Sequence, residues 1–324
     1  MEIFKARKKV YNILDKGKIF FILSMVAFIA AIVLVSTKGL ALGIDFAGGT
    51  VVQVQYDKTP NIDTIRTKLN QNALFAKATV TPYGDKGEIV IKTPASNQKI
   101  DRDVSDITRE VLAGTGNFDI RKVDMVGPKV GSELRTKGLT AFALALGVIL
   151  LSVSFRYEFR FAIAGVIALL HDIVITMGAI SLFNIDVNLE TIAAILTILG
   201  YSIHDTIIVF DRVRENIGES KSSDFKEIIN EAVSRTLSRT ILTSFTLFLV
   251  VLILYIFGGE MMHSFSFPML VGVTVGTYSS VFVAAQLVIW SGFNVDKYRA
   301  KEAEKLKRAK EKDKMRAMYE KGTI

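Results

Sequence analysis

Residues 161–183 read FAIAGVIALLHDIVITMGAISLF. Apart from one histidine and one aspartate the run is apolar or small, and as a helix it is long enough to cross the roughly 30 Å hydrocarbon layer of a bilayer. Comparable runs occur along the whole chain. The sequence therefore predicts a polytopic α-helical membrane protein with spans at 19–37, 138–155, 161–183, 189–210, 239–257 and 265–290.

The composition excludes several kinds of chemistry. Half of the 324 residues are hydrophobic and none is cysteine, so no disulfide, thiolate nucleophile or cysteine metal site can form. The glycine-rich segment Asp45–Thr50 is not a phosphate loop, because no Gly-x-x-x-x-Gly-Lys-Ser/Thr pattern is present, and neither is His-Glu-x-x-His. We expect no metal, no cofactor and no enzymatic chemistry.

The first span carries a basic flank, as secretory signals do. The run 19–37 is longer than a usual signal core, and no clean Ala-x-Ala cleavage site follows it. The sequence therefore predicts an uncleaved anchor. The flanking cations are Lys5, Arg7, Lys8, Lys9, Lys16 and Lys18.

Loop charges predict the orientation. The short loops 184–188 and 258–264 contain no lysine or arginine, whereas the loops on the opposite side are basic. By the positive-inside rule, both termini (1–18 and 291–324) are predicted to be cytoplasmic in a multi-pass membrane protein. The net charge of +8 is thus an orientation signal, and we expect no nucleic-acid partner. The basic loop residues are Arg156, Arg160, Arg212, Arg214, Lys221, Lys226 and Arg235.

Residues 38–137 form a polar segment between the first two spans, on the periplasmic side. Their pattern predicts a β-α-β-β-α-β order, which suggests a ferredoxin-like α+β domain. Asn61 is the expected N-cap of the first helix. The predicted elements are strand 43–56, helix 61–72, strands 78–82 and 88–92 joined by a turn at 83–87, helix 97–112 and strand 118–126.

Two further segments lie on the cytoplasmic side. Apolar residues recur at helical spacing in 222–239, so residues 211–238 are predicted to hold an amphipathic helix that either lies on the membrane surface or packs beneath the bundle. The tail 297–321 is charged on nearly every turn. We expect a solvated helix or disordered arm near anionic lipids, with a ribosome or translocon contact as the alternative.

Charged side chains within the spans are the candidate functional residues, because each costs roughly 2.5–3.5 kcal/mol at the centre of a membrane helix. They are His171 and Asp172 in the third span, Asp205 with its neighbour His204 in the fourth, and Arg239 at the start of the fifth. At about 1.5 Å of rise per residue, Asp172 lies roughly 16 Å into its span and Asp205 about 9 Å from the end of its own. Asp205 and Arg239 can meet if their spans are neighbours.

Such a pair suggests a proton relay. Asp205 would be ionised beside Arg239 and protonated when that contact loosens, with nearby hydroxyls holding water. Static alternatives remain open: a fixed ion pair, an arginine that extends to the interface, and an aspartate and histidine satisfied within the bundle. Because successive residues lie about 100° apart, His171 and Asp172 are expected to point in different directions. The supporting hydroxyls are Ser202, Thr206, Thr236, Thr240 and Thr243.

Several motifs resemble the SecD/SecF family of protein-export membrane proteins. The stretch 196–216, LTILGYSIHDTIIVFDRVREN, together with 236–240, TLSRT, is similar to the SecF branch. The residue before the aspartate is commonly Asn in that family, and here it is His204. The other matching motifs are GIDFAGGT at 43–50 with Asp45, Gly48 and Gly49, Gly127-Pro128 before the second span, FRYEFR at 155–160, and His171-Asp172.

The resemblance implies a six-span half of the resistance-nodulation-division (RND) type that pairs with SecD beside the SecYEG channel, in some complexes with YidC and YajC. It implies that the proton-motive force promotes the movement of unfolded preproteins, with protons as the coupling ion. It also implicates the positions of Asp205 and Arg239 in proton transfer. Two alternatives stand beside it: an RND-type exporter of small molecules or lipids, and a scaffold of the translocon with inert charges.

Overall fold

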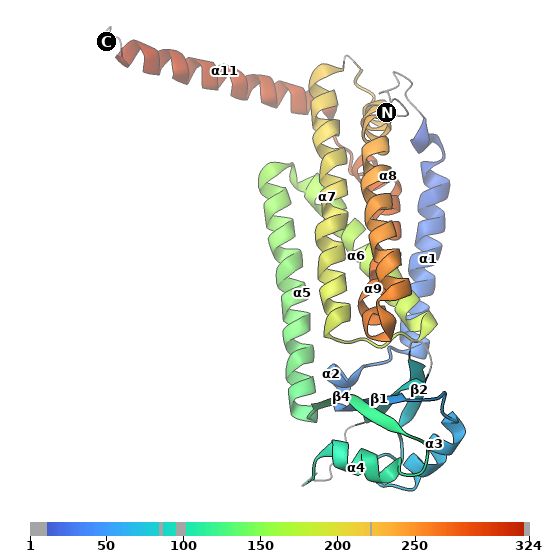
Figure 1. Cartoon of the computed structure of the whole chain (residues 1–324). Helices are drawn as coiled ribbons and strands as arrows, with labels where there is room; N and C mark the ends of the chain where they lie inside the picture. The colour runs from blue at the N-terminus through green and yellow to red at the C-terminus, as the bar shows by residue number, and fades with distance from the viewer. Residues whose placement is uncertain (1–11, 84–86, 95–101, 221, 321–324) are drawn as a thin grey trace.

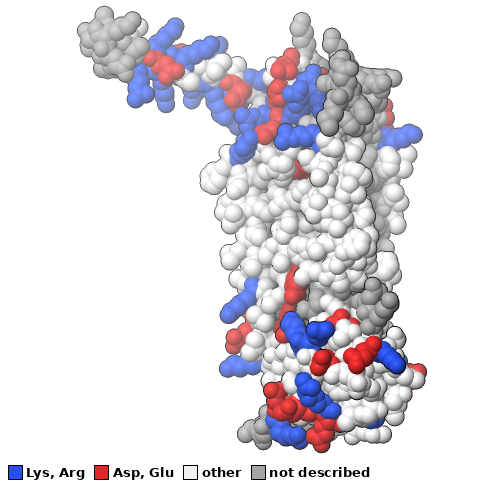
Figure 2. Space-filling view, viewed as in Figure 1, with Lys and Arg blue, Asp and Glu red and all other residues white. Residues whose placement is uncertain are grey.

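The computed structural model describes residues 12–83, 87–94, 102–220 and 222–320. Within them, six helices long and apolar enough to cross a membrane stand side by side, and a small α+β domain caps one end (Figure 1). An uncharged band separates two charged ends (Figure 2). The predicted six-span fold is confirmed. The spans are α1 (Gly17–Lys38), α5 (Pro128–Arg156), α6 (Phe159–Phe183), α7 (Leu189–Glu219), α8 (Phe225–Phe257) and Met262–Trp290.

The last span is not a regular helix. It consists of α9 (Gly259–Ser279), a π-helical turn η2 (Ser280–Ala284) and α10 (Ala285–Trp290). Short π-helical turns inside α-helices often occur at functional sites. This span lies with α6 and α7 in the buried interior of the bundle, whereas α1, α5 and α8 are mostly exposed along its outside.

The α+β domain has the predicted ferredoxin-like topology. Its sheet has the order β2-β3-β1-β4, and every neighbouring pair is antiparallel. The strands and the helices α3 and α4 share a core that includes Val52, Ile65 and Ile91. Asn61 caps α3 as predicted, since its side chain accepts from Asp63 N and Thr64 N. The elements are β1 (Gly49–Tyr56), α3 (Ile62–Asn70), β2 (Thr79–Tyr83), β3 (Glu88–Pro94), α4 (Val104–Val111) and β4 (Phe118–Val126).

Four local predictions need correction or fall partly outside the described residues. The predicted strand 43–56 is wrong at its start, because Ile44–Ala47 forms a helical turn, α2, and β1 begins at Gly49. The helix predicted at 97–112 begins at Val104 in the described part of the chain, with Asp103 as its N-cap. Residues 84–86 of the predicted turn, residues 97–101 of that predicted helix and residues 1–11 of the predicted N-terminus lie outside the described residues.

The paired glycines Gly48 and Gly49 allow the chain to turn from α2 into β1. Gly48 and Gly49 have φ of +74° and +148°, values that residues with a Cβ rarely adopt. A Cβ on Gly49 would lie 2.4 Å from the carbonyl oxygen of Thr93 in β3. At the start of α5, a Cβ on Gly131 would lie 3.1 Å from the carbonyl oxygen of Phe46. Because Gly49 and Gly131 have no side chain, their backbones can pack directly against the backbones of β3 and α2.

Main-chain and ionic contacts fasten the domain to the bundle. Gly43 N donates to Val187 O at 3.0 Å, and Val187 N donates to Ala41 O at 2.7 Å, so the α1–α2 linker pairs with the loop between α6 and α7. In the same loop, Asp186 Oδ2 forms an ion pair with Lys92 Nζ of β3 at 2.5 Å. These contacts connect the sheet directly to the loop that precedes α7.

The predicted amphipathic helix at 211–238 is not a separate element. Residues 211–219 continue α7 beyond its span, and α8 begins at Phe225 and runs without a break into the fifth span. The Asp224 side chain caps α8 by accepting from Lys226 N. Ile228 and Ile229 are buried in the same cluster as Ile217. The apolar face thus packs beneath the bundle, the second of the two arrangements considered.

The basic tail is a helix, α11 (Val295–Glu320), which extends sideways from the bundle at the end opposite the α+β domain (Figure 1). Arg299 fixes its base by donating to Ile217 O, Ser220 O and Ser222 O at 2.7–2.9 Å, and so caps the end of α7. Beyond this base its described side chains are exposed.

Gly49→Ala is expected to destabilise the protein by about 2–4 kcal/mol, because the methyl group meets the Thr93 carbonyl and the positive φ is strained. Thermal unfolding of the purified full chain, followed by circular dichroism, measures the loss. Gly147→Ala in α5 is the control, since nothing lies within 4 Å of its Cβ position. Equal stability of the two variants would show that the glycine pair is not required for packing.

Candidate functional site within the bundle

Asp172 is fully buried on α6 and is surrounded by donors. Its Oδ2 accepts from Ser202 Oγ of α7 at 2.6 Å and from Ser279 Oγ of α9 at 2.8 Å. Its Oδ1 lies 3.0 Å from His171 Nδ1. A carboxyl group with all of these partners is held by the bundle, and it links the three central helices.

His171 extends this network to the first span. Its Nε2 lies 2.5 Å from Ser24 Oγ of α1, and the Phe28 ring stacks on the imidazole at 5.9 Å between centroids. As predicted, His171 and Asp172 point towards different helices, since His171 contacts α1 and Asp172 contacts α7 and α9, but the two side chains also contact each other. Since α6 is central, with α1 on one side and α7 and α9 on the other, both directions lead into the protein.

Asp205 on α7 is also buried, but it is poorly satisfied. Within the described residues its Oδ1 has no hydrogen-bond partner. Its Oδ2 lies 3.3 Å from Ser244 Oγ of α8, whose single hydrogen has a closer acceptor in Thr240 O at 2.8 Å. Tyr201 OH and Thr277 Oγ1 both donate to Ser244, so this hydroxyl is the centre of the cluster. A carboxyl group with one shared donor is suited to exchange a proton.

Arg239 and His204 lie at the outer edge of this cluster. The α7 and α8 helices are neighbours, as the predicted meeting of Asp205 and Arg239 requires. In the described part of the chain, however, Arg239 forms no salt bridge with Asp205, and its side chain is exposed on α8. His204 is 60% exposed, and its Nδ1 lies 3.9 Å from Asp205 Oδ1. The structure therefore shows an Asp205 approached by His204, with the arginine apart.

Of the predicted hydroxyls, only that of Ser202 donates to a carboxyl group in the described part of the chain. Ser202 serves Asp172 and not Asp205. Thr206 donates to Ser202 O and lies 3.4 Å from Ser280 Oγ in the π-helical turn. Thr240 Oγ1 is buried beside Asp205's partner Ser244 and has no partner of its own in the described chain. Thr236 and Thr243 donate to carbonyls of their own helix.

Five residues that the sequence analysis did not single out as site residues complete the clusters: Ser24, Tyr201, Ser244, Thr277 and Ser279. Tyr201 and Ser244 were detectable, because they lie four residues from Asp205 and Thr240 and so share their helix faces. The other three are in α1 and α9, and only the packing of those helices brings them to α6, α7 and α8. On α9, Thr277 belongs to the Asp205 cluster and Ser279 to the Asp172 cluster.

The family-motif residues form a structural junction and not part of this site. Asp45 Oδ2 accepts from Leu189 N at 2.9 Å and so binds the first amide of α7. Gly127 is the N-cap of α5 and Pro128 its first residue, a position that suits proline. Within the described residues no group of three or more histidines and carboxylates has a geometry that would hold a metal ion.

Comparison with known proteins matches both regions. The family model for the C-terminal region of the protein export membrane proteins SecD and SecF matches residues 107–294, and the SecD/SecF GG motif matches residues 33–60. The chain belongs to the SecD/SecF family. The GG motif corresponds to the end of α1, the turn α2, the paired glycines and β1.

The family's curated relatives at high coverage are SecF subunits. The protein translocase subunit SecF of Helicobacter pylori is 46% identical over the full length of both chains. That of Vibrio alginolyticus is 39% identical over 94% of this chain and 96% of its own. The chain is therefore similar to SecF along its whole length, including the charged spans.

Solved SecD/SecF structures share the fold. The crystal structure of SecDF from Thermus thermophilus aligns with 88% of this chain at a TM-score of 0.79 and 33% identity, and the chain spans 39% of that larger protein. The crystal structure of SecDF in its super-membrane-facing form aligns with 93% of this chain at a TM-score of 0.66 and 32% identity. The aligned part is 41% of that larger protein. The predicted RND-like half with one ferredoxin-like domain is thereby confirmed.

Ser202→Ala combined with Ser279→Ala removes both hydroxyl donors to Asp172 Oδ2. We expect a loss of about 2–4 kcal/mol, since each missing donor to a buried charged group costs about 1–3 kcal/mol and the two losses overlap. The midpoint of thermal unfolding measures it. Thr197→Ala, whose hydroxyl is exposed and bonds its own helix, is the matched control. An unchanged midpoint would indicate that Asp172 does not hold the helices together.

Proposed function

We propose that this chain, as the SecF-type subunit of a protein translocase, works with SecD to convert the proton-motive force into preprotein movement across the bacterial inner membrane. SecYEG is the expected channel, with YidC and YajC as further partners and lipids as the surrounding solvent. Asp205 is the proton-binding group, and the protein performs no covalent chemistry. The observation that supports the proposal is the contrast between two buried carboxyl groups, one fully bonded and one almost unbonded.

The exposed polar face beside Asp205 supports a partner within the membrane. His204, Arg239 and Thr243 are exposed at positions that belong to membrane-spanning helices. Polar and ionisable groups facing lipid are costly, so this face is expected to be covered. The relative solved as SecDF contains more than twice the length of this chain, and its remaining part offers a covering SecD half.

The proposed cycle depends on two arrangements of the same groups. In the described arrangement Asp205 has one shared hydroxyl donor, and binding a proton removes an uncompensated buried charge. In the second arrangement the Arg239 side chain turns inward and stabilises the carboxylate, which has then released the proton. A proton taken up in one arrangement and released in the other biases the cycle, at about 2.3 kcal/mol per charge moved through 100 mV.

The α+β domain is the proposed output. Asp205 lies on α7, and Asp45 of α2 accepts from the first amide of the same helix. The Lys92–Asp186 ion pair joins the sheet to the loop before α7. A shift of α7 therefore moves the domain, which by the loop charges is periplasmic. The domain would in turn act on preprotein emerging from the channel.

The two alternatives lose support to different degrees. An exporter of small molecules or lipids is disfavoured because the chain belongs to the SecD/SecF family along its whole length. An inert scaffold is favoured by no specific observation, since a purely structural carboxyl group would be bonded as Asp172 is. The experiment on Asp205 separates the scaffold from the motor.

Asp205→Asn is expected to abolish proton-dependent stimulation of export, because an amide of the same shape cannot exchange a proton. Insertion and assembly with SecD should stay normal, as Oδ1 has no hydrogen bond to lose in the described structure. The measurement is preprotein translocation into membrane vesicles, with and without an imposed proton gradient. Asp119→Asn, an exposed carboxyl on β4, is the control. Full stimulation in the Asp205 variant would rule out the mechanism.

A further inference from the structure

A cavity of about 380 Å³ opens at the end of the bundle opposite the α+β domain. It lies between the α5–α6 turn, the extension of α7 and the base of α11. The proposed transport cycle does not involve this cavity. Its lining combines aromatic rings with four cations, Arg156, Arg214, Lys301 and Lys305, and two carboxylates, Glu158 and Glu302.

The cavity wall formed by α11 is fixed and does not depend on the free part of that helix. Arg299 donates to three carbonyls at the end of α7 and in its connection to α8, and Ser223 Oγ donates to Asp296 at 2.8 Å. The Phe293 ring stacks on Phe225 at 4.8 Å between centroids. Arg160 donates to the carbonyls of residues 291 and 292, just before α11. The site is therefore built before any ligand arrives.

The cavity has a surplus of positive charge. Lys301 lies 3.7 Å from Glu158 and Lys305 lies 3.7 Å from Glu302, both long, exposed ion pairs that an incoming anion can replace. Arg214 donates to the carbonyl of Arg156, and the described residues provide it with no carboxylate partner.

A further carboxylate, Asp211, pairs with one of the four cavity cations, Arg156, and leaves the others unaffected. Asp211 accepts from Arg156 at 2.8 Å and from Tyr157 OH at 2.6 Å. Burial, reinforced by this hydrogen bond, raises the pKa of Tyr157 to about 12, so its hydroxyl stays protonated and keeps donating to Asp211. Asp211 therefore does not neutralise Arg214 or Lys301.

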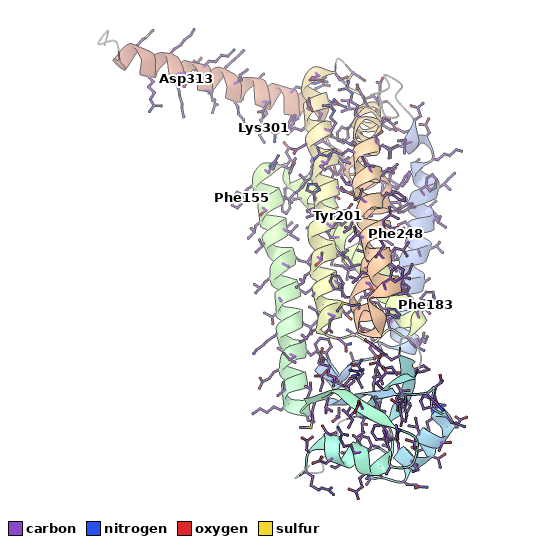
Figure 3. All side chains as sticks on the ribbon, in the orientation of Figure 1. Phe155, Phe183, Tyr201, Phe248, Lys301 and Asp313 are labelled. Carbon is purple, nitrogen blue, oxygen red and sulfur yellow. The ribbon has the colours of Figure 1, made fainter. Side chains whose placement is uncertain are left out.

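An apolar surface leads directly to this cationic cavity. Phe155, in the last turn of α5, is 90% exposed, and Figure 3 shows it below Lys301 of α11. Leu144, Val148 and Leu151 are each at least 60% exposed and precede Phe155 at steps of three and four residues. They form one lipid-facing stripe along α5 that ends at the cavity.

We infer that this cavity binds the phosphate headgroup of an anionic phospholipid, with its acyl chains along the apolar stripe of α5. Basic pockets at the cytoplasmic ends of membrane helices suit such headgroups. The apolar stripe distinguishes a lipid from free phosphate or a nucleic acid, because neither of those has a hydrocarbon part to cover it. The headgroup would fix α5 relative to α7 and α11.

The test uses a tryptophan reporter at the cavity. The only tryptophan of the chain, Trp290, is removed by Trp290→Phe, and Phe155→Trp introduces an indole at the site. The full chain is placed in phosphatidylcholine vesicles that contain phosphatidylglycerol, with bromine on the acyl chains of one lipid or the other. Quenching of the indole then measures which lipid is enriched beside it. We expect phosphatidylglycerol to be preferred at least about fivefold, the effect of a single cation near a membrane surface.

Arg214→Gln with Lys301→Gln should reduce this preference to nearly one. Lys310→Gln with Lys314→Gln, which removes the same charge from the exposed part of α11, should leave it intact. Equal quenching by both lipids in the parent, or the same loss in both double variants, would overturn the inference. Release of the brominated lipid by millimolar inorganic phosphate or by an RNA oligonucleotide would also overturn it, since the site would then take a soluble anion.

Discussion

An ionisable group inside a bilayer must be bonded, paired or neutralised, and this constraint organises the bundle. Asp172 meets it by collecting Ser202, Ser279 and His171 from three helices, so a costly group becomes the link that holds α6, α7 and α9 in register. Ser24 extends the same network to α1 through the imidazole. The packing of the central helices depends on this bonded carboxyl group.

Asp205 lies on α7, three residues after Ser202, and meets the same constraint incompletely. Ser244 must divide its single hydrogen between Asp205 and a backbone carbonyl, and Oδ1 has no partner in the described chain. We propose different roles for these two carboxyl groups: one stabilises an arrangement of helices, and the other responds to a proton. Both clusters include a residue of α9 just before the π-helical turn at Ser280, Ser279 for Asp172 and Thr277 for Asp205.

The junction at the other end of α7 makes such a response mechanically useful. The paired glycines allow α2, β3 and α5 to meet at backbone distance, and Asp45 binds the first amide of α7. The Lys92–Asp186 ion pair and the main-chain pairing of residues 41–43 with 187 complete the connection. The carboxyl group that we propose to bind the proton is thus connected, through α7, to a folded domain by few, short contacts.

The sequence by itself determined the spans, the ferredoxin-like order and the charged candidates, because apolar runs, strand alternation and the cost of a buried charge are local properties. It did not determine which hydroxyl serves which carboxyl group. Ser202 was assigned to Asp205 from proximity along the chain, yet it bonds Asp172, because α6 packs against that face of α7. The same holds for residues 211–238, which belong to two helices, and for Arg239, which faces outward. Only tertiary packing decides such pairings, since they depend on the rotation of each helix against its neighbours.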